Sequence, residues 1–284
     1  MKTKIAIHKD SVKEAFALNG KVAIITGGAG LLGAKHAEAI AEMGGIPLLV
    51  DIDEKRAQEQ AKNIADRFGV EAKAYYCDIT NEKALKELLS RVLKEFKKVD
   101  ILINNAANNP KVEGGASGLS SQLENFPLDT WNKDMDVGLT GAFLCSKIIG
   151  TQMSRQGKGA ILNIASDLAI VAPDQRIYRK PGQKEEDQFT KPISYSVVKS
   201  GLIGMTRYLA TYWAKKGVRV NAISPGGVYN NQNEGFVKRL SNLIPLGRMA
   251  DKDEYKAAIV FLVSDASSYM TGANLVIDGG KTCW

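Results

Sequence analysis

The chain has 284 residues, of which 44% are hydrophobic, 24% charged and 7% aromatic, and this balance excludes a disordered, collagen-like or disulfide-stapled chain. Its formal net charge is +7, yet the lysines alternate with glutamates in segments such as 55–67 and 83–98, as on solvated helix faces. No basic run is interleaved with aromatic residues, so the charge does not indicate a nucleic-acid partner.

The cysteines and the lack of long apolar runs indicate the compartment. Cys77, Cys145 and Cys283 are few and widely spaced, which indicates a reducing environment and argues against a structural zinc. No apolar run approaches the roughly 20 residues that a membrane span needs, and the opening MKTKIAIHKD lacks the apolar segment of a secretory signal. We therefore expect a cytoplasmic protein with no membrane partner.

After a polar N-terminal arm at 1–20, short β-branched runs alternate with longer amphipathic segments. Strands are predicted at 22–25, 46–50, 72–76, 101–103, 160–164, 218–222 and 275–277. Helices are predicted at 32–44, 54–68, 81–97, 130–155, 194–216 and 252–263. Near-continuous apolar strands separated by helices indicate a parallel sheet covered on both faces. The predicted fold is therefore α/β: a single-domain, doubly wound (Rossmann-like) parallel sheet of about seven strands, formed by residues 21–284.

The segment 173–193 interrupts this alternation. It is polar and charged and holds three prolines, so it is expected to stay out of the core, and it is too long for an ordinary connection. In an α/β sheet such an excursion usually overlies the ligand crevice or projects toward a partner.

The first predicted strand leads into a glycine-rich turn, TGGAGLLG at 26–33, which opens the first predicted helix. Glycines allow a tight turn and a close approach of the backbone to a pyrophosphate, and the helix N-terminus supplies unpaired N–H groups. A plain glycine-rich turn is the alternative interpretation. The residues predicted to hold a dinucleotide here are Gly27, Gly28, Gly30, Leu31 and Leu32.

The second predicted strand ends in LLVDID, which places Asp51 18 residues beyond Gly33 (51 − 33). A carboxylate at this point can accept hydrogen bonds from an adenosine ribose and would repel a 2′-phosphate. The next arginine along the chain is Arg56. The pattern therefore predicts NAD (NAD+/NADH) rather than NADP, unless Asp51 is only a solvated acid at a strand end.

Tyr195 and Lys199 lie on one face of the predicted helix 194–216, because they are four residues apart. A tyrosine has a pKa near 10, and a neighbouring ammonium together with a cationic nicotinamide would favour its phenolate. This spacing is common in surface pairs. Ser166 gives it weight, because it ends the apolar strand ILNIAS, where doubly wound sheets bind ligands.

These segments resemble the short-chain dehydrogenase/reductase family over nearly the whole chain after the arm. The matching segments are TGGAGLLG, CDIT (77–80), NNAA (104–107), ILNIAS, YSVVK (195–199), NAISPGG (221–227) and VIDGG (276–280). The resemblance implies that 21–284 is a dinucleotide-binding catalytic domain, which transfers a hydride between nicotinamide and a carbon that carries a hydroxyl or ketone.

The resemblance also implies the roles of individual residues. Ser166 would orient the substrate oxygen, Tyr195 would exchange the hydroxyl proton, and Lys199 would bind the nicotinamide ribose and tune Tyr195. Asn104 would line the cofactor channel and Asn105 would have a structural role. The implied cofactor-binding set is completed by Ile52, Asp78, Ile79, Ala106, Pro225, Gly226 and Val228, with Ile223 beside the nicotinamide.

The sequence departs from the family pattern at two points. Gly138, in GLTG, stands where the family usually has an asparagine that holds a water linking the lysine to solvent. Its carbonyl could still bind such a water, or the glycine could merely permit a local bulge. Ser166 and Tyr195 are 29 positions apart (195 − 166) rather than about a dozen, and the excess corresponds to the 173–193 excursion.

A polar substrate is expected from the excursion and from a predicted substrate lid at 227–250. The lid is rich in amides, which can donate to or accept from sugar hydroxyls. The candidate substrate residues are Asp174, Gln175, Arg176, Tyr229 and Asn230. A phosphorylated or amino-hexose substrate is expected, with Arg176 or Arg179 as its phosphate ligand.

The GLTG, excursion, lid and terminal TCW segments resemble more closely the flagellin-modification (legionaminic-type sugar biosynthesis) branch of the family. Two alternatives remain: a general polyol or gluconate-type dehydrogenase, and a nucleotide-binding regulatory protein that lost the reaction. His8 and His36 have no partners at ligand spacing, so no metal is expected. The resemblance further implies a homodimer or homotetramer built on the two longest helices and the last strand.

Overall fold

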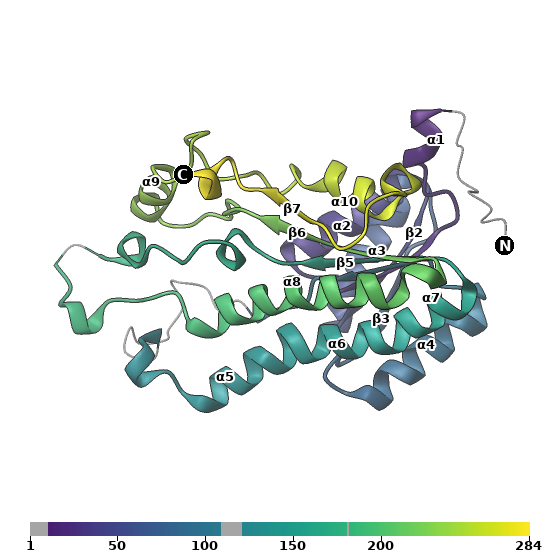
Figure 1. Ribbon diagram of the computed structural model, residues 1–284, viewed down its shortest axis with the longest axis horizontal. Coiled ribbons are helices and arrows are strands. Elements are labelled where there is room, and N and C mark those ends of the chain that lie inside the picture. The colour runs from purple at the N-terminus through teal and green to yellow at the C-terminus, as the bar shows by residue number, and fades with distance from the viewer. Residues whose placement is uncertain (1–10, 109–120, 181) are drawn as a thin grey trace.

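The computed structural model describes residues 11–108, 121–180 and 182–284, and its centre is one parallel sheet of seven strands (Figure 1). The strand order is β3-β2-β1-β4-β5-β6-β7, which confirms the predicted doubly wound α/β fold. The strands are β1 (Val22–Thr26), β2 (Ile46–Asp51), β3 (Lys73–Tyr76), β4 (Ile101–Asn104), β5 (Gly159–Ile164), β6 (Val218–Pro225) and β7 (Asn274–Ile277).

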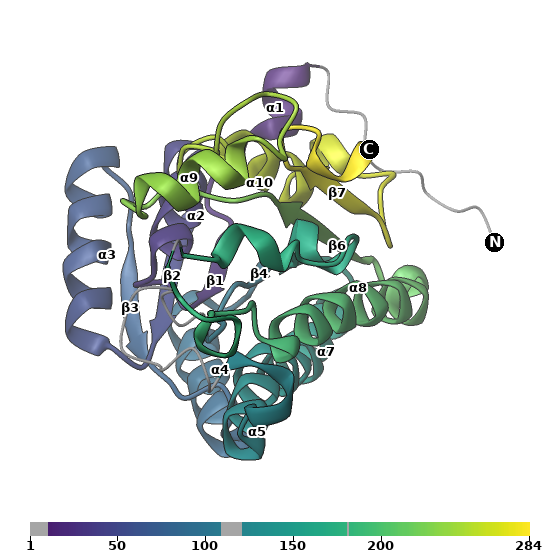
Figure 2. The same cartoon turned by 90° about the vertical axis from the view of Figure 1, so that its left-hand side faces the viewer.

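Helices cover both faces of this sheet (Figures 1 and 2). One face carries α2 (Leu31–Glu42), α3 (Glu54–Phe68) and α10 (Lys256–Val263). The other carries α4 (Glu82–Phe96), the helical run of α5 (Leu128–Met135), α6 (Gly141–Cys145) and α7 (Thr151–Gln156), and α8 (Ile193–Trp213). Two short helices, α1 (Val12–Phe16) and α9 (Glu234–Ser241), lie in the expected arm and lid.

The side chains of each strand divide between two apolar cores because successive strand residues point to opposite faces. In β1, Ala23 and Ile25 pack with α2, α3 and α10, whereas Val22 and Ile24 pack toward α4 and α8. All five residues of β1 are buried. Burial on both faces is the reason why the strands read as continuous apolar runs rather than as alternating ones.

Local signals fix where the surface helices begin and end. Asp53 caps α3 by accepting a hydrogen bond from the N–H of Arg56, and the left-handed Gly69 ends that helix. Asn81 caps α4 in the same way, by accepting from the N–H groups of Lys83 and Ala84. The predicted and observed ends of these two helices therefore agree to within one residue.

The arm, the excursion and the lid are more structured than the sequence indicated. The described part of the arm contains α1 and the buried Leu18, and Phe16 contacts Phe261 with ring centroids 6.2 Å apart. Residues 1–10 of the arm, including His8, and Pro181 of the excursion lie outside the described residues. Across the helices that are described, none is long and apolar enough to cross a membrane.

The excursion was expected to stay out of the core, and this expectation is wrong for the apolar turn that it contains. Ile177 and Tyr178 are each 7% exposed, in a third apolar cluster that they share with Leu240, Ile244 and Met249 of the lid. The 3₁₀ turn Gln175–Tyr178 carries both apolar side chains, so the turn buries them while its neighbours stay in solvent. Excursion and lid thus form one apolar contact.

Gly138 lies where the helical run 128–156 crosses α8. It belongs to the π turn Asp136–Thr140, so the expected local bulge is present. A Cβ on Gly138 would lie 2.5 Å from Cγ1 of Val198, and in return a Cβ on Gly201 of α8 would lie 2.9 Å from Cδ2 of Leu139. The two glycines therefore permit the close packing of the helices.

We predict that Gly138→Asn lowers the free energy of unfolding by about 1–3 kcal/mol, because its Cβ must displace Val198. Val198→Ala opens that space, so the double variant should lose less stability than the sum of the two single changes. Denaturant unfolding measures all three variants. Gly204→Ala is the control, because a Cβ there meets nothing within 4 Å. An unfolding free energy for Gly138→Asn equal to that of the unaltered protein would contradict this account of the glycine.

Candidate active site

The described residues enclose a cavity of about 1110 Å³ at the carboxyl ends of β1, β2, β4, β5 and β6. One end is lined by the glycine-rich turn and by the segments after β2 and β3. The other end is lined by the segment after β5, the excursion, the start of α8 and the lid. The cavity spans the point between β1 and β4 where the strand order reverses, which is the usual ligand site of such sheets.

The glycine-rich turn has the shape that a pyrophosphate group requires. Gly27 has a left-handed backbone with φ of 63°. A Cβ on Gly28 would lie 2.8 Å from the Cα of Leu49, and one on Gly33 would lie 2.1 Å from the carbonyl oxygen of Gly27. Gly30 caps α2 without a side-chain hydrogen bond, which leaves the first N–H groups of the helix available to an anion. These residues therefore fit a dinucleotide.

The adenosine end of the cavity is formed by residues that follow β2 and β3. Asp51, Ile52, Asp78 and Ile79 all line it, as predicted from their motifs. The Asp51 carboxylate also holds the turn itself, because it accepts a hydrogen bond of 2.9 Å from the N–H of Ala29. A negative charge is thus fixed beside the glycine-rich turn.

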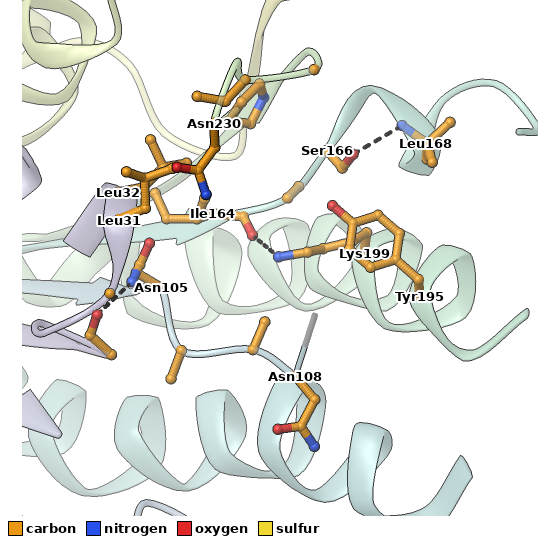
Figure 3. Close-up of a pocket in the computed structure, with 18 of the residues that line it drawn as sticks. Leu31, Leu32, Asn105, Asn108, Ile164, Ser166, Leu168, Tyr195, Lys199 and Asn230 are labelled. Carbon is orange, nitrogen blue, oxygen red and sulfur yellow. Dashed lines mark hydrogen bonds between the residues drawn. The ribbon is translucent and has the colours of Figure 1, made fainter. Parts of the chain in front are cut away.

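Of the two asparagines of the NNAA segment, Asn104 has a different position from the one expected, whereas Asn105 has the expected structural contacts. Asn104 is 3% exposed and does not line the cavity, because its amide donates to Oδ1 of Asn163 (2.8 Å) and to Oγ of Ser146 (3.0 Å) behind the wall. Asn105 lines the cavity and donates to the carbonyl oxygens of Thr26 and Gly27 (Figure 3). Strand alternation explains this, because neighbouring residues point in opposite directions.

Ser166, Tyr195 and Lys199 come together at the other end of the cavity (Figure 3). Ser166 acts on the Tyr195 hydroxyl and favours its ionised form. The ammonium of Lys199 donates to the carbonyl oxygen of Ile164 at 2.7 Å and lies 5.8 Å from the centroid of the Tyr195 ring. A phenol, a hydroxyl and an ammonium in this arrangement can orient an alcohol or ketone oxygen and exchange a proton with it.

Burial decides the acidity of these groups. It raises the pKa of Tyr195 above its usual value; the hydrogen bond with Ser166 opposes this rise, and the Asp167 carboxylate adds to it. The direction is opposite to the one expected from Lys199, because removal of water from the phenolate outweighs the nearby positive charge. Burial also lowers the pKa of Lys199 to about 8, and Lys191 lowers it further.

Three charged residues missed in the sequence surround this group. The ammonium of Lys191 lies 3.8 Å from the centroid of the Tyr195 ring, and burial lowers its pKa to about 8. Asp167 accepts a hydrogen bond from Ser166 Oγ and forms an ion pair with Lys281 at 2.7 Å. Their positions next to predicted site residues could have revealed them. Asp167 follows Ser166, Lys281 follows VIDGG, and Lys191 precedes Tyr195 by four residues.

The structure separates the candidate substrate residues into two groups. Asp174 and Asn230 line the cavity, whereas Gln175, Arg176 and Tyr229 are absent from its wall. Arg176 is 79% exposed and bound to Asp174, and Arg179 pairs with Glu185 beside a second hollow. The remaining predicted cofactor residues fall on the wall except Gly28 and Ile223, and those that line it are Gly27, Gly30, Leu31, Leu32, Ala106, Pro225, Gly226 and Val228.

Metal binding was not expected, and no group of three or more metal-ligating side chains occurs within residues 11–108, 121–180 and 182–284. His36 is buried in α2, where burial lowers its pKa to about 3.

Comparison with known proteins identifies the family. The family model described as short chain dehydrogenase matches residues 21–178, and the one described as enoyl-(acyl carrier protein) reductase matches residues 184–282. The chain belongs to the short-chain dehydrogenase/reductase family. The resemblance read from the seven motifs is thereby confirmed at the level of the family.

Individual members of the short-chain dehydrogenase/reductase family align with nearly the whole chain. The D-threitol dehydrogenase of Mycolicibacterium smegmatis is 35% identical, over 96% of this chain and 96% of that protein. The NADP-dependent mannitol dehydrogenase of Hypocrea jecorina is 33% identical, over 95% of each chain. The crystal structure of NAD+-bound xylitol dehydrogenase superposes with a TM-score of 0.80 at 29% identity, over 93% of this chain and 99% of that one. The relatives thus include an NADP-dependent enzyme and an enzyme that binds NAD+.

Proposed function

We propose that the protein is an NAD(H)-dependent oxidoreductase that interconverts a hydroxyl and a keto group on a polyol or a related uncharged sugar. The observation that carries this proposal is the meeting of Ser166, Tyr195 and Lys199 at one end of a cavity whose other end holds the glycine-rich turn and Asp51. One cavity thus has a place for a dinucleotide and, beyond it, a proton-exchanging group.

The chemistry follows from the positions of the side chains. When bound, the dinucleotide supplies the hydride acceptor or donor. In the oxidising direction, Tyr195 as phenolate takes the hydroxyl proton of the substrate, and the Ser166 hydroxyl turns from Asp167 to donate to the same oxygen. The Lys199 ammonium, fixed by the Ile164 carbonyl, stabilises the phenolate. In the reducing direction Tyr195 returns the proton to the new alkoxide.

The choice of NAD is supported by Asp51. Its carboxylate lies on the cavity wall beside the turn and bonds to Ala29 and Asp53, so its charge is held in place. A ribose hydroxyl can donate to such a group, and a charge-assisted hydrogen bond contributes about 1.5–3 kcal/mol. A 2′-phosphate brought to the same position would meet like charge.

A polyol is better supported as the substrate than the phosphorylated sugar expected from the sequence. The relatives named above are threitol, mannitol and xylitol dehydrogenases. Arg176 and Arg179, the expected phosphate ligands, are absent from the cavity wall and pair with the carboxylates of Asp174 and Glu185. The lid still presents Asn230 and Asn231 to the cavity, and both amides can bond to hydroxyls.

Four other expectations from the sequence concern the branch of the family, a regulatory role, the oligomeric state and the location. The relatives named above include no member of the flagellin-modification branch, so we do not carry that branch into the proposal. The regulatory alternative is weakened because the three proton-transfer side chains lie together. The homodimer or homotetramer and the cytoplasmic location stay predictions, and light scattering of the purified protein measures the first of them.

We predict that Asp51→Asn raises the ratio of kcat/KM with NADP to kcat/KM with NAD by tenfold or more. The change removes the charge but keeps an oxygen that can accept from the Ala29 N–H, so the turn is retained. Steady-state kinetics with both dinucleotides measure the ratio. Asp53→Asn is the control, because Asn also caps helices and Asp53 is absent from the cavity wall. An NADP preference in the unaltered protein would contradict the proposal.

We predict that threitol, xylitol, mannitol or a similar polyol reduces NAD with a higher kcat/KM than phosphorylated or amino sugars do.

Oxidation should accelerate as pH rises, because burial raises the pKa of Tyr195 and the phenolate forms only toward alkaline pH. Tyr195→Phe should lower kcat by roughly 10²–10⁴-fold. Cofactor absorbance measures all rates. Faster turnover of sugar phosphates would overturn the substrate class, and an active Tyr195→Phe variant would overturn the mechanism.

A further inference from the structure

Behind Ser166 lies a buried ion pair that the proposed reaction does not use. The Asp167 side chain is 7% exposed and that of Lys281 10%, and their charged atoms are 2.7 Å apart. Asp167 Oδ1 also accepts hydrogen bonds from Ser166 Oγ at 2.8 Å and from the N–H of Leu168 at 2.9 Å. The carboxylate therefore joins the proton-transfer group to a residue near the C-terminus.

The carboxylate fixes the direction of the Ser166 hydroxyl. Serine has one proton, whereas an ionised carboxylate can only accept. The Ser166 hydroxyl therefore donates to Asp167 until a substrate oxygen takes over as acceptor, and its own oxygen accepts from the N–H of Leu168 at 3.2 Å. Ser166 thus connects Tyr195, whose ionisation it favours, with the ion pair of Asp167 and Lys281.

Lys281 is brought to this position by the turn after β7. Gly279 and Gly280 have left-handed backbones, with φ of 67° and 90°. The Asp278 carboxylate accepts from the N–H groups of Gly280 (2.9 Å) and Thr282 (2.8 Å), which folds the tail back toward the end of β5. The turn therefore delivers one positive charge to the buried carboxylate.

We propose that Asp167 and Lys281 are positioning residues for proton transfer at Tyr195: Asp167 holds the Ser166 hydroxyl, and Lys281 neutralises the charge that Asp167 places behind the phenol. The inference rests on the proposed role of Tyr195. It explains how a carboxylate can lie one hydrogen bond from Ser166 and still allow the phenolate that oxidation requires, because the ammonium opposes its field.

The groups that face Tyr195 come from several elements. Lys199 lies on α8, and Lys191 precedes that helix and stacks on the ring. Tyr178 of the excursion interacts with Tyr195, and Asp167 follows β5. Beyond these, the charge of Asp134 on α5 raises the pKa of Lys191, and the charge of Lys281 lowers the pKa of Asp174. Within this set, Asp167 and Lys281 form a closed pair, so removal of either one changes the local charge by one unit.

The test is the titration of the Tyr195 phenol in the full-length protein, read by NMR from ring-labelled tyrosine and assigned with Tyr195→Phe. Asp167→Asn leaves Lys281 uncompensated and should lower the pKa of Tyr195 by roughly half a unit to one unit. Lys281→Met leaves Asp167 uncompensated and should raise it by a similar amount. The double variant restores neutrality and should titrate close to the unaltered protein.

Two controls separate charge from structure. Lys281→Arg keeps the charge and should leave the titration unchanged. If the methionine variant does not fold, Lys281→Gln, which is also neutral, takes its place and is compared with Lys281→Arg. Lys158→Met removes an ion-paired lysine next to the opposite end of β5 and should also change nothing. The proposal would be overturned if the pKa of Tyr195 shifted in the same direction in Asp167→Asn and Lys281→Met, or if it shifted in neither variant.

The titration needs no substrate, so it is decided separately from the proposed reaction. If polyols are turned over, the pH profile of kcat/KM should move in the same direction as the phenol titration in each variant. If no polyol or ketose is turned over, the proposed function fails, whereas opposite shifts of the phenol would still support the charge compensation.

Discussion

The reversal of strand order between β1 and β4 is the constraint on which the site depends. The chain leaves β1 for α2 on one face of the sheet and leaves β4 for the α5–α7 run on the other. The two connections diverge at the carboxyl ends of these strands and leave a crevice between them. The glycine-rich turn, Asn105 and Ser166 all lie at that edge, because each follows or ends a strand of the central sheet.

A second consequence is the concentration of charge in a partly dry site. Lys191, Lys199 and Lys281 line the same end of the cavity as Asp167 and Tyr195. Burial lowers the pKa of Lys191 and of Lys199 to about 8 and raises that of Tyr195. Charges interact more strongly there than in water. The acidity of the phenol is therefore a balance among several charged groups rather than a property of one tyrosine–lysine pair.

Sequence alone predicted the sheet, the main helices, the glycine-rich turn and the proton-transfer residues of the cavity, because these depend on apolar periodicity and on motifs that each lie within a few residues. It could not predict contacts between distant segments. Asp167 and Lys281 are 114 positions apart, and neither stands out before the terminal turn is folded. The role of Gly138 depends on its contact with Val198 of another helix, which the sequence does not show. Strand alternation determines which asparagine of NNAA reaches the cavity.

The central claim is that the phenol of Tyr195 stands where a bound dinucleotide presents its reacting ring. A crystal structure of the protein with NAD tests this most directly. The account predicts the pyrophosphate on the turn 26–33, the adenosine ribose at Asp51, and the nicotinamide beside Tyr195 and Lys199. A dinucleotide bound elsewhere, or a nicotinamide directed away from Tyr195 into solvent, would contradict it.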